Sequence, residues 1–168
     1  MKNDRVNARA IARLRRLLKG MTAGMFVTET PAGEFRSRPM LLQALDDHGW
    51  LWFLTDARSR KIFDLSRNPE ALVTFQSPHG DRYLSIEGTA VVVKDQLRVK
   101  KLWHATYRAW YPKGKTDPEI VLLALKVSRV DYWQVPRSRL ARAAGAVGAL
   151  VTRKRYEAGH GTLTVGNA

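Results

Sequence analysis

Three extended runs joined by short turn sequences, all within residues 22–54, constrain the fold more than any other feature of the sequence. The runs cover residues 25–28, 35–45 and 50–54, and the segments between them carry Pro, Gly and Asp, which favour tight turns. A parallel pair of strands needs a crossover of about a dozen residues, and these connections are too short for one. The sequence therefore predicts an antiparallel meander rather than a βαβ unit.

Extended and amphipathic segments alternate along the rest of the chain. Further strands are expected at residues 71–76, 83–93, 120–127 and 132–135, and helices at residues 8–19, 59–67 and 95–110. Gly88 lies inside one of these strands, where a glycine often marks a bulge or a barrel corner. Together these elements predict a mainly β fold, a small closed β-barrel with flanking α-helices.

The chain of 168 residues has the length of one domain. Residues 1–20 are expected to form a basic amphipathic helix packed on the domain, because Ile11, Leu14 and Leu18 make one apolar stripe. Residues 21–136 would hold the barrel, and residues 137–168 would be a basic C-terminal extension.

The net charge of +14 lies mostly at the two ends of the chain. Residues 1–20 carry seven Lys or Arg against one Asp, and residues 137–168 carry six against one Glu. A basic module that binds nucleic acid or an acidic membrane is therefore one alternative. Solvated helix faces and a polar tail explain the same charge, and we do not expect nucleic-acid binding. No apolar run is long enough to span a membrane, and the N-terminal residues lack the apolar core of a secretory signal. We therefore expect a cytoplasmic location.

The sequence contains none of the common catalytic or metal-binding motifs. Cysteine is absent and the four histidines share no ligand spacing, so no metal site is expected. Asp46 and Asp47 are adjacent in a turn and point apart, which does not suit a catalytic dyad. The catalytic residues are therefore unassigned.

Cationic and hydroxyl residues suggest a phosphate site in the first half of the chain. Arg36 and Arg38 fall on one face of their expected strand. The helix that follows the meander begins with Ser59, Arg60 and Lys61, and its first N–H groups would be free to bind an anion. The alternative is that these Arg and Lys side chains are solvated on an exposed edge.

Motifs spread along the chain resemble, in order and spacing, those of the FMN-binding split-barrel superfamily. They are S-R-P-M at 37–40, W-L-W-F-L-T-D at 50–56, S-R-K at 59–61, R-N-P at 67–69, R-Y-L-S-I-E-G at 82–88 and D-Y-W at 131–133. Within that superfamily the chain is most similar to the bacterial general stress proteins, which resemble pyridoxamine 5'-phosphate oxidase. The resemblance covers residues 10–156. It implies a six-stranded antiparallel Greek-key split barrel that forms homodimers, with FMN, or alternatively FAD, at the subunit interface.

The resemblance also implies roles for individual residues. Arg38 would meet the flavin phosphate, and Leu54 would face the isoalloxazine ring. Tyr83 would contact the cofactor from the neighbouring strand, and Trp133 would reach the flavin of the second subunit. The other cofactor-binding residues implied in this way are Thr55, Ser59, Arg60 and Lys61.

Two departures separate the chain from the oxidase. Gln43 stands where the oxidase has a cationic phosphate partner, and Ala141 stands where it has a substrate-holding histidine, although Arg139 could supply the accompanying arginine. We therefore expect a flavin-binding protein of the general stress protein type without pyridoxamine 5'-phosphate oxidase activity. A flavin-dependent oxidoreductase and a non-catalytic flavin sensor or sequestering protein both remain open.

Two strongly apolar runs, residues 50–54 and 120–125, favour a homodimer independently. Together with Trp103, Trp110 and Trp133 they carry more apolar surface than one small barrel is expected to cover. We expect a two-fold homodimer that buries more than ~2,000 Å².

Overall fold

The computed structural model describes residues 8–135 and 159–166. Its strands are β1 (Ala23–Glu29), β2 (Phe35–Leu45), β3 (Trp50–Asp56), β4 (Glu70–Gln76), β5 (Arg82–Val93), β6 (Ile120–Gln134) and β7 (Gly159–Thr164). Its helices are α1 (Ala8–Leu17), α2 (Arg60–Arg67), α3 (Gln96–Leu102) and the 3₁₀ helix η1 (Ala105–Ala109).

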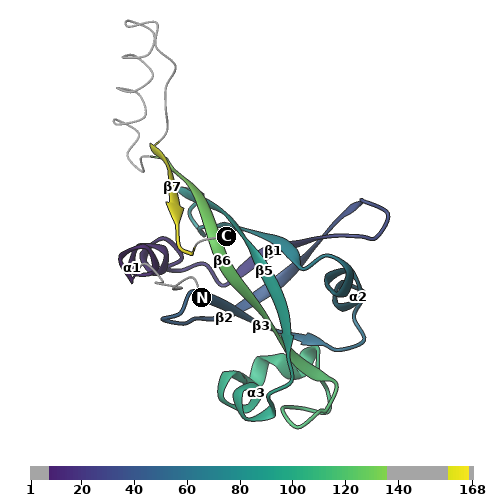
Figure 1. Ribbon diagram of the computed structural model, residues 1–168. Coiled ribbons are helices and arrows are strands. Elements are labelled where there is room, and N and C mark those ends of the chain that lie inside the picture. Colours follow the sequence, from purple (N-terminus) through teal and green to yellow (C-terminus); the bar gives the residue numbers. More distant parts are fainter. Residues whose placement is uncertain (1–7, 136–158, 167–168) are drawn as a thin grey trace, which may run out of the picture.

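Six of these strands close an antiparallel barrel (Figure 1). Their hydrogen-bonded order is β3-β2-β1-β4-β5-β6, and β3 pairs back with β6 to close the ring. The long strand β6 pairs with β3 along its first half and with β7 along its second half, so β7 extends the sheet beyond the barrel. The predicted mainly β fold, a closed six-stranded antiparallel barrel with flanking helices, is confirmed.

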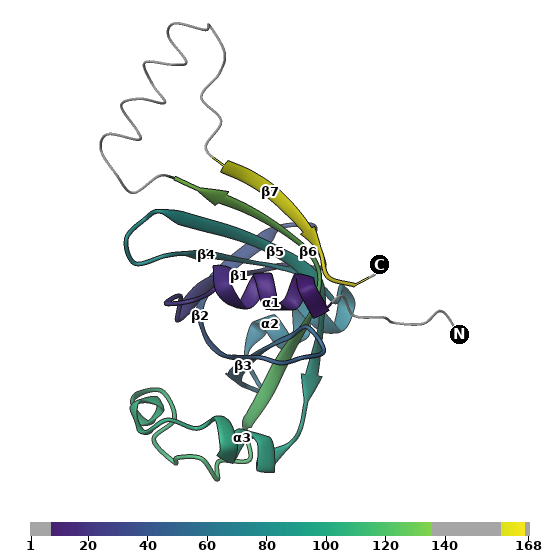
Figure 2. The same ribbon diagram turned by 90° about the vertical axis from the view of Figure 1, so that its left-hand side faces the viewer.

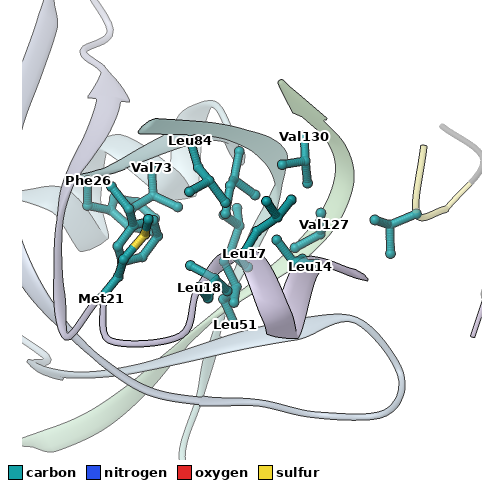
Figure 3. Packing of buried hydrophobic residues seen from close by; sticks show 14 of the residues in the cluster. Leu14, Leu17, Leu18, Met21, Phe26, Leu51, Val73, Leu84, Val127 and Val130 are labelled. Carbon is teal, nitrogen blue, oxygen red and sulfur yellow. The ribbon is translucent and has the colours of Figure 1, made fainter. Parts of the chain in front are cut away.

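Helices α1 and α2 lie on opposite sides of the barrel (Figures 1 and 2). Leu14 and Leu17 of α1 point into the main hydrophobic core and meet side chains from β3, β5 and β6 (Figure 3), and Ile11 belongs to the same cluster. All three are almost fully buried, and burial of such a side chain stabilises a fold by roughly 1.5–3 kcal/mol. The basic helix therefore packs on the barrel through its apolar stripe.

Gly88 forms the bulge expected from its place inside a strand. The register of β5 against β6 shifts between Glu87 and Gly88. A Cβ atom at Gly88 would overlap the carbonyl oxygen of Lys126, so a larger residue requires β6 to move. The bulge bends β5 and β6 as barrel closure requires.

Two expected elements differ from the structure. The single helix expected over residues 95–110 is wrong, because Trp103 and His104 are extended and separate α3 from η1. Trp103 instead packs against Tyr107 and Tyr111, with ring centroids 5.8 and 6.2 Å away, so aromatic packing outweighs helix propensity. The two strands expected at residues 120–127 and 132–135 are one strand, because the residues between them continue to pair with β5.

The outer faces of β3 and β6 are covered within the chain. Trp52 and Leu54 of β3 and Leu122 of β6 form a second hydrophobic cluster with Val99 of α3 and Tyr107 of η1. Helices α3 and η1 therefore cover these two strands, contrary to that part of the expectation, whereas Trp110 and Trp133 remain 65% and 39% exposed. A homodimer must therefore be argued from other surfaces.

The end of the chain contributes to the same sheet. Residues 159–164, which belong to the expected C-terminal extension, form β7, and Val165 is buried in the main core. The expected boundary at residues 136–137, with Arg139 and Ala141, lies outside the described residues. Within residues 8–135 and 159–166, no helix is long and apolar enough to cross a membrane.

Candidate functional site

The start of helix α2 places hydroxyl and amino groups beside the end of strand β3. Lys61 Nζ donates a hydrogen bond to Thr55 Oγ1 at 2.8 Å, and the hydroxyl oxygens of Thr55 and Ser59 lie 3.3 Å apart. Ser59 is the N-cap of α2, as expected, but its hydroxyl makes no capping hydrogen bond. The N–H groups at this helix start therefore have no side-chain cap, and such groups readily bind anions.

Arg38 reaches the same corner of the barrel from strand β2. Its Nη1 donates to Thr28 Oγ1 at 2.7 Å, and its Nη2 lies 3.6 Å from Asp64 Oδ2. Thr28 Oγ1 donates in turn to Asp64 Oδ2 at 3.0 Å, and both side chains are almost fully buried. A buried carboxylate on α2 thus positions the Arg38 guanidinium, while the Arg38 side chain stays 21% exposed.

Arg38 and Lys61 form a cluster of two cations that influence each other. Burial lowers the pKa of Lys61, and the charge of Arg38 lowers it further, against the opposing effect of Asp56. Burial likewise lowers the pKa of Arg38 despite its attraction to Asp64. Arg60 is exposed at the first position of α2 and is next to Lys61 in the chain. A bound anion would relieve the repulsion between these cations, so the cluster has the chemistry of a phosphate site.

Leu54 precedes Thr55 on β3 and faces the other side of the strand. It lines a cavity of about 210 Å³ together with Gln43, Tyr107, Trp110 and Tyr111. The cation cluster and an aromatic cavity are therefore joined by two consecutive residues of one strand.

Tyr83 and Trp133 lie together on strands β5 and β6. They are cross-strand neighbours on β5 and β6, each is 39% exposed, and both line an open groove of about 560 Å³ that includes Met25. The groove extends across β1 and β4 to Pro39 of β2, the residue next to Arg38, and Ala23 and Pro39 also line the cavity beside Leu54. The predicted site residues thus fall into two groups. Tyr83 and Trp133 form one, and the other consists of Arg38, Leu54, Thr55, Ser59, Arg60 and Lys61.

The sequence analysis missed several residues at these sites. Thr28 and Asp64 hold Arg38, and the only available signal was a carboxylate on the inner face of the helix that opens at Ser59. His160 of β7 pairs with Trp133, and the two rings stack with centroids 5.2 Å apart. No local sequence pattern places His160 there, because 26 residues separate it from Trp133 in the chain.

The family comparison agrees with this geometry. The model of the pyridoxamine 5'-phosphate oxidase like family matches residues 9–157. This chain belongs to that family. This match confirms the expected resemblance to the pyridoxamine 5'-phosphate oxidase family, and the likeness to general stress proteins is confirmed by the solved structures described next.

Individual relatives are distant. Protein bli-3 of Neurospora crassa is 24% identical over 139 residues, which cover 77% of this chain and 66% of the Neurospora protein, just under two thirds of its length. The crystal structure of the general stress FMN/FAD binding protein from Xanthomonas citri is 28% identical with a TM-score of 0.64, over 77% of this chain and 92% of that one. General stress protein 26 from Bacillus anthracis shares the fold at 24% identity with a TM-score of 0.65, over 73% and 92%.

Proposed function

We propose that this chain is a flavin-binding protein of the general stress protein type, with the phosphate of FMN or FAD at the Arg38–Lys61 cluster. The observation that carries the proposal is this pair of neighbouring, partly buried cations at an uncapped helix start. Family membership, and the FMN/FAD-binding neighbour from Xanthomonas citri, support a flavin among phosphate-bearing ligands.

The donor groups fit a phosphate. Arg38 offers a planar guanidinium fixed by Asp64, and Lys61 offers a point charge held by Thr55. Ser59 adds a hydroxyl beside the N–H groups of α2. Hydrogen bonds to charged groups contribute about 1.5–3 kcal/mol each, so the phosphate would supply a large share of the affinity.

The proposal includes a homodimer in which each flavin contacts both chains. Leu54 would face the isoalloxazine ring in one chain, and Tyr83 and Trp133 of the second copy would complete the site. Support comes from the half-exposed side chains of Tyr83 and Trp133, which line an open groove of about 560 Å³ that a second copy would cover.

A bound flavin would supply hydride or electron transfer, and the residues of this chain would bind and orient it. Pyridoxamine 5'-phosphate oxidation is not part of the proposal, because Gln43 is neutral and engaged by Tyr107 and the Leu41 carbonyl. Anaerobic mixing of the flavin-loaded protein with NADH and NADPH separates the two remaining roles. Bleaching of the flavin absorbance identifies an oxidoreductase, and unchanged absorbance excludes both nicotinamides as its electron donors.

Titration with FMN, followed by flavin fluorescence, tests the binding itself. We expect a saturable change in fluorescence, and no change up to tens of micromolar contradicts the proposal. Lys61→Met keeps the length of the side chain, removes its charge and should weaken FMN binding by about 10- to 100-fold. Lys100→Met, an exposed position on α3, is the matched control and should bind FMN like the wild type.

A further inference from the structure

Strand β7 places a histidine ring against one of the half-exposed aromatic residues of the groove. His160 pairs with Trp133 in the register of β7 on β6, and their rings stack with centroids 5.2 Å apart and an angle of 29° between the ring planes. Tyr83 is the neighbour of Trp133 on the opposite strand, β5. Trp133 is therefore flanked on the sheet by aromatic side chains from both neighbouring strands.

Contacts on either side of the histidine hold β7 on the barrel. Val165, directly after the strand, is buried in the main core. Thr162 Oγ1 donates a hydrogen bond to Asp131 Oδ1 of β6 at 2.5 Å. A Cβ atom at Gly161 would overlap the ring of Tyr132, so the glycine lets β7 pass close over that ring. These contacts fix the strand, and the strand in turn fixes the place of the histidine ring.

The stack limits the freedom of a side chain that lies on an open surface. Trp133 is 39% exposed and lines the groove of about 560 Å³. A side chain in such a place is free to change its rotamer, and ordering it when a ligand binds lowers the affinity. The His160 ring covers one face of the indole in advance and leaves the opposite face for a ligand. The pair is thus arranged for binding before a ligand arrives.

We propose that His160 is a positioning residue of the flavin site. Its ring fixes the orientation of Trp133, and in the homodimer this places Trp133 against the flavin held at the Arg38–Lys61 cluster of the second copy. Strand β7 of one chain thereby completes the flavin site of the other. The inference rests on the proposed function, which assigns Trp133 to the flavin.

Titration of three β7 variants with FMN tests this role. His160→Ala removes the stacked ring and should weaken FMN binding about three- to tenfold. His160→Phe keeps an aromatic ring at this position and should bind FMN within about twofold of the wild type. Thr164→Ala, at another exposed residue on the same face of β7, is the matched control and should bind FMN like the wild type.

The melting temperatures of the FMN-free proteins show whether His160 acts on the fold instead. All three variants should melt like the wild type, because the side chains of His160 and Thr164 are exposed. Unchanged FMN affinity in His160→Ala, or an equal loss in His160→Ala and His160→Phe, overturns the inference. Weaker FMN binding that accompanies a lower melting temperature of His160→Ala assigns a structural role to His160 and overturns it too.

A mixed dimer tests whether His160 acts across the subunit interface. Chains with Lys61→Met and chains with His160→Ala are co-expressed with two different affinity tags, and the dimers that carry both tags are purified. In our account, one flavin site of this dimer carries both changes and the other carries neither. Half of the sites should therefore bind FMN with wild-type affinity, although neither variant alone has such a site. If no site binds FMN more tightly than the His160→Ala protein does, His160 acts within its own chain and the inference is wrong.

The outcomes separate this inference from the proposed function. A wild type that does not bind FMN refutes both. FMN binding that Trp133→Ala weakens and His160→Ala leaves unchanged refutes the role of His160 alone and leaves the proposed function in place.

Discussion

Replacement of the buried carboxylate of Asp64 by an amide should destabilise the free protein and tighten its binding of FMN. Asp64 Oδ2 accepts a hydrogen bond from Thr28 and lies 3.6 Å from Arg38 Nη2. In Asp64→Asn, the amide oxygen can still accept from Thr28, so the main loss is the negative charge beside Arg38. That charge holds Arg38 in the free protein and repels an incoming phosphate.

The size of the destabilisation follows from the distance between the charges of Arg38 and Asp64. At 3.6 Å and an effective dielectric constant of about 20, the Coulomb attraction is about 4–5 kcal/mol. The Arg38 side chain is partly exposed, so solvent screening reduces the expected loss of unfolding free energy to about 1–3 kcal/mol. For a chain of this length, that lowers the melting temperature by about 3–10 °C. Thr28 Oγ1 still accepts from Arg38 Nη1 in Asp64→Asn and keeps the guanidinium in place, so without the repulsion FMN should bind about tenfold more tightly, equivalent to ~1.4 kcal/mol.

Thermal unfolding with and without saturating FMN measures both effects, because a ligand raises the melting temperature more as its affinity rises. Without FMN, the melting temperature of Asp64→Asn should be lower than that of the wild type, and saturating FMN should raise it by more. Asp47→Asn is the matched control, because its exposed pair with Arg15 contributes only about 0–1 kcal/mol and lies away from the cluster. Weaker FMN binding by Asp64→Asn, at an unchanged melting temperature, would refute this reasoning.

Three further predictions concern the barrel, the pH dependence and the assembly. Gly88→Ala should lower the unfolding free energy by about 2–4 kcal/mol in denaturant titration, because its Cβ meets the Lys126 backbone. The control Gly159→Ala should lower it much less, because the nearest neighbour of its Cβ is 3.7 Å away. Because the pKa of Lys61 is lowered, FMN affinity should fall with rising pH before the ordinary lysine value of 10.5 is reached. Parallel titrations of Lys61→Met should show no such fall. The same fall in both proteins would exclude Lys61 as its cause. Sedimentation at micromolar concentration should give twice the chain mass of 19.0 kDa, and Trp133→Ala should weaken FMN binding while the dimer persists; a single species at the chain mass would exclude the homodimer.

Local patterns were enough to predict much of the barrel from sequence. The turns around Gly33 and Gly49, both with positive φ, define the first hairpins, and Gly88 marks the bulge. The helix over residues 95–110 failed because Trp103 leaves the helical conformation to pack on aromatic rings, a tertiary effect that helix propensity does not contain. The covering of β3 by α3 and η1 was missed for the same reason.

The candidate site likewise contains residues that local sequence patterns predict and residues that they do not. Thr55, Ser59 and Lys61 are close in the chain, so their meeting at the start of α2 could be predicted. The Thr28–Asp64–Arg38 arrangement joins three separate elements and has no local signature. The pairing of His160 with Trp133 depends on β7, which the sequence pattern did not predict.

The central claim, that the phosphate of a flavin lies at the Arg38–Lys61 cluster, is tested most directly by comparing FMN with riboflavin, which lacks the phosphate. The dissociation constants of both ligands are measured for the wild type and for Lys61→Met. Our account predicts that the wild type prefers FMN, and that Lys61→Met loses about 10- to 100-fold in FMN affinity while its riboflavin affinity stays the same. An equal loss for both ligands, or a wild type that does not distinguish them, would contradict it.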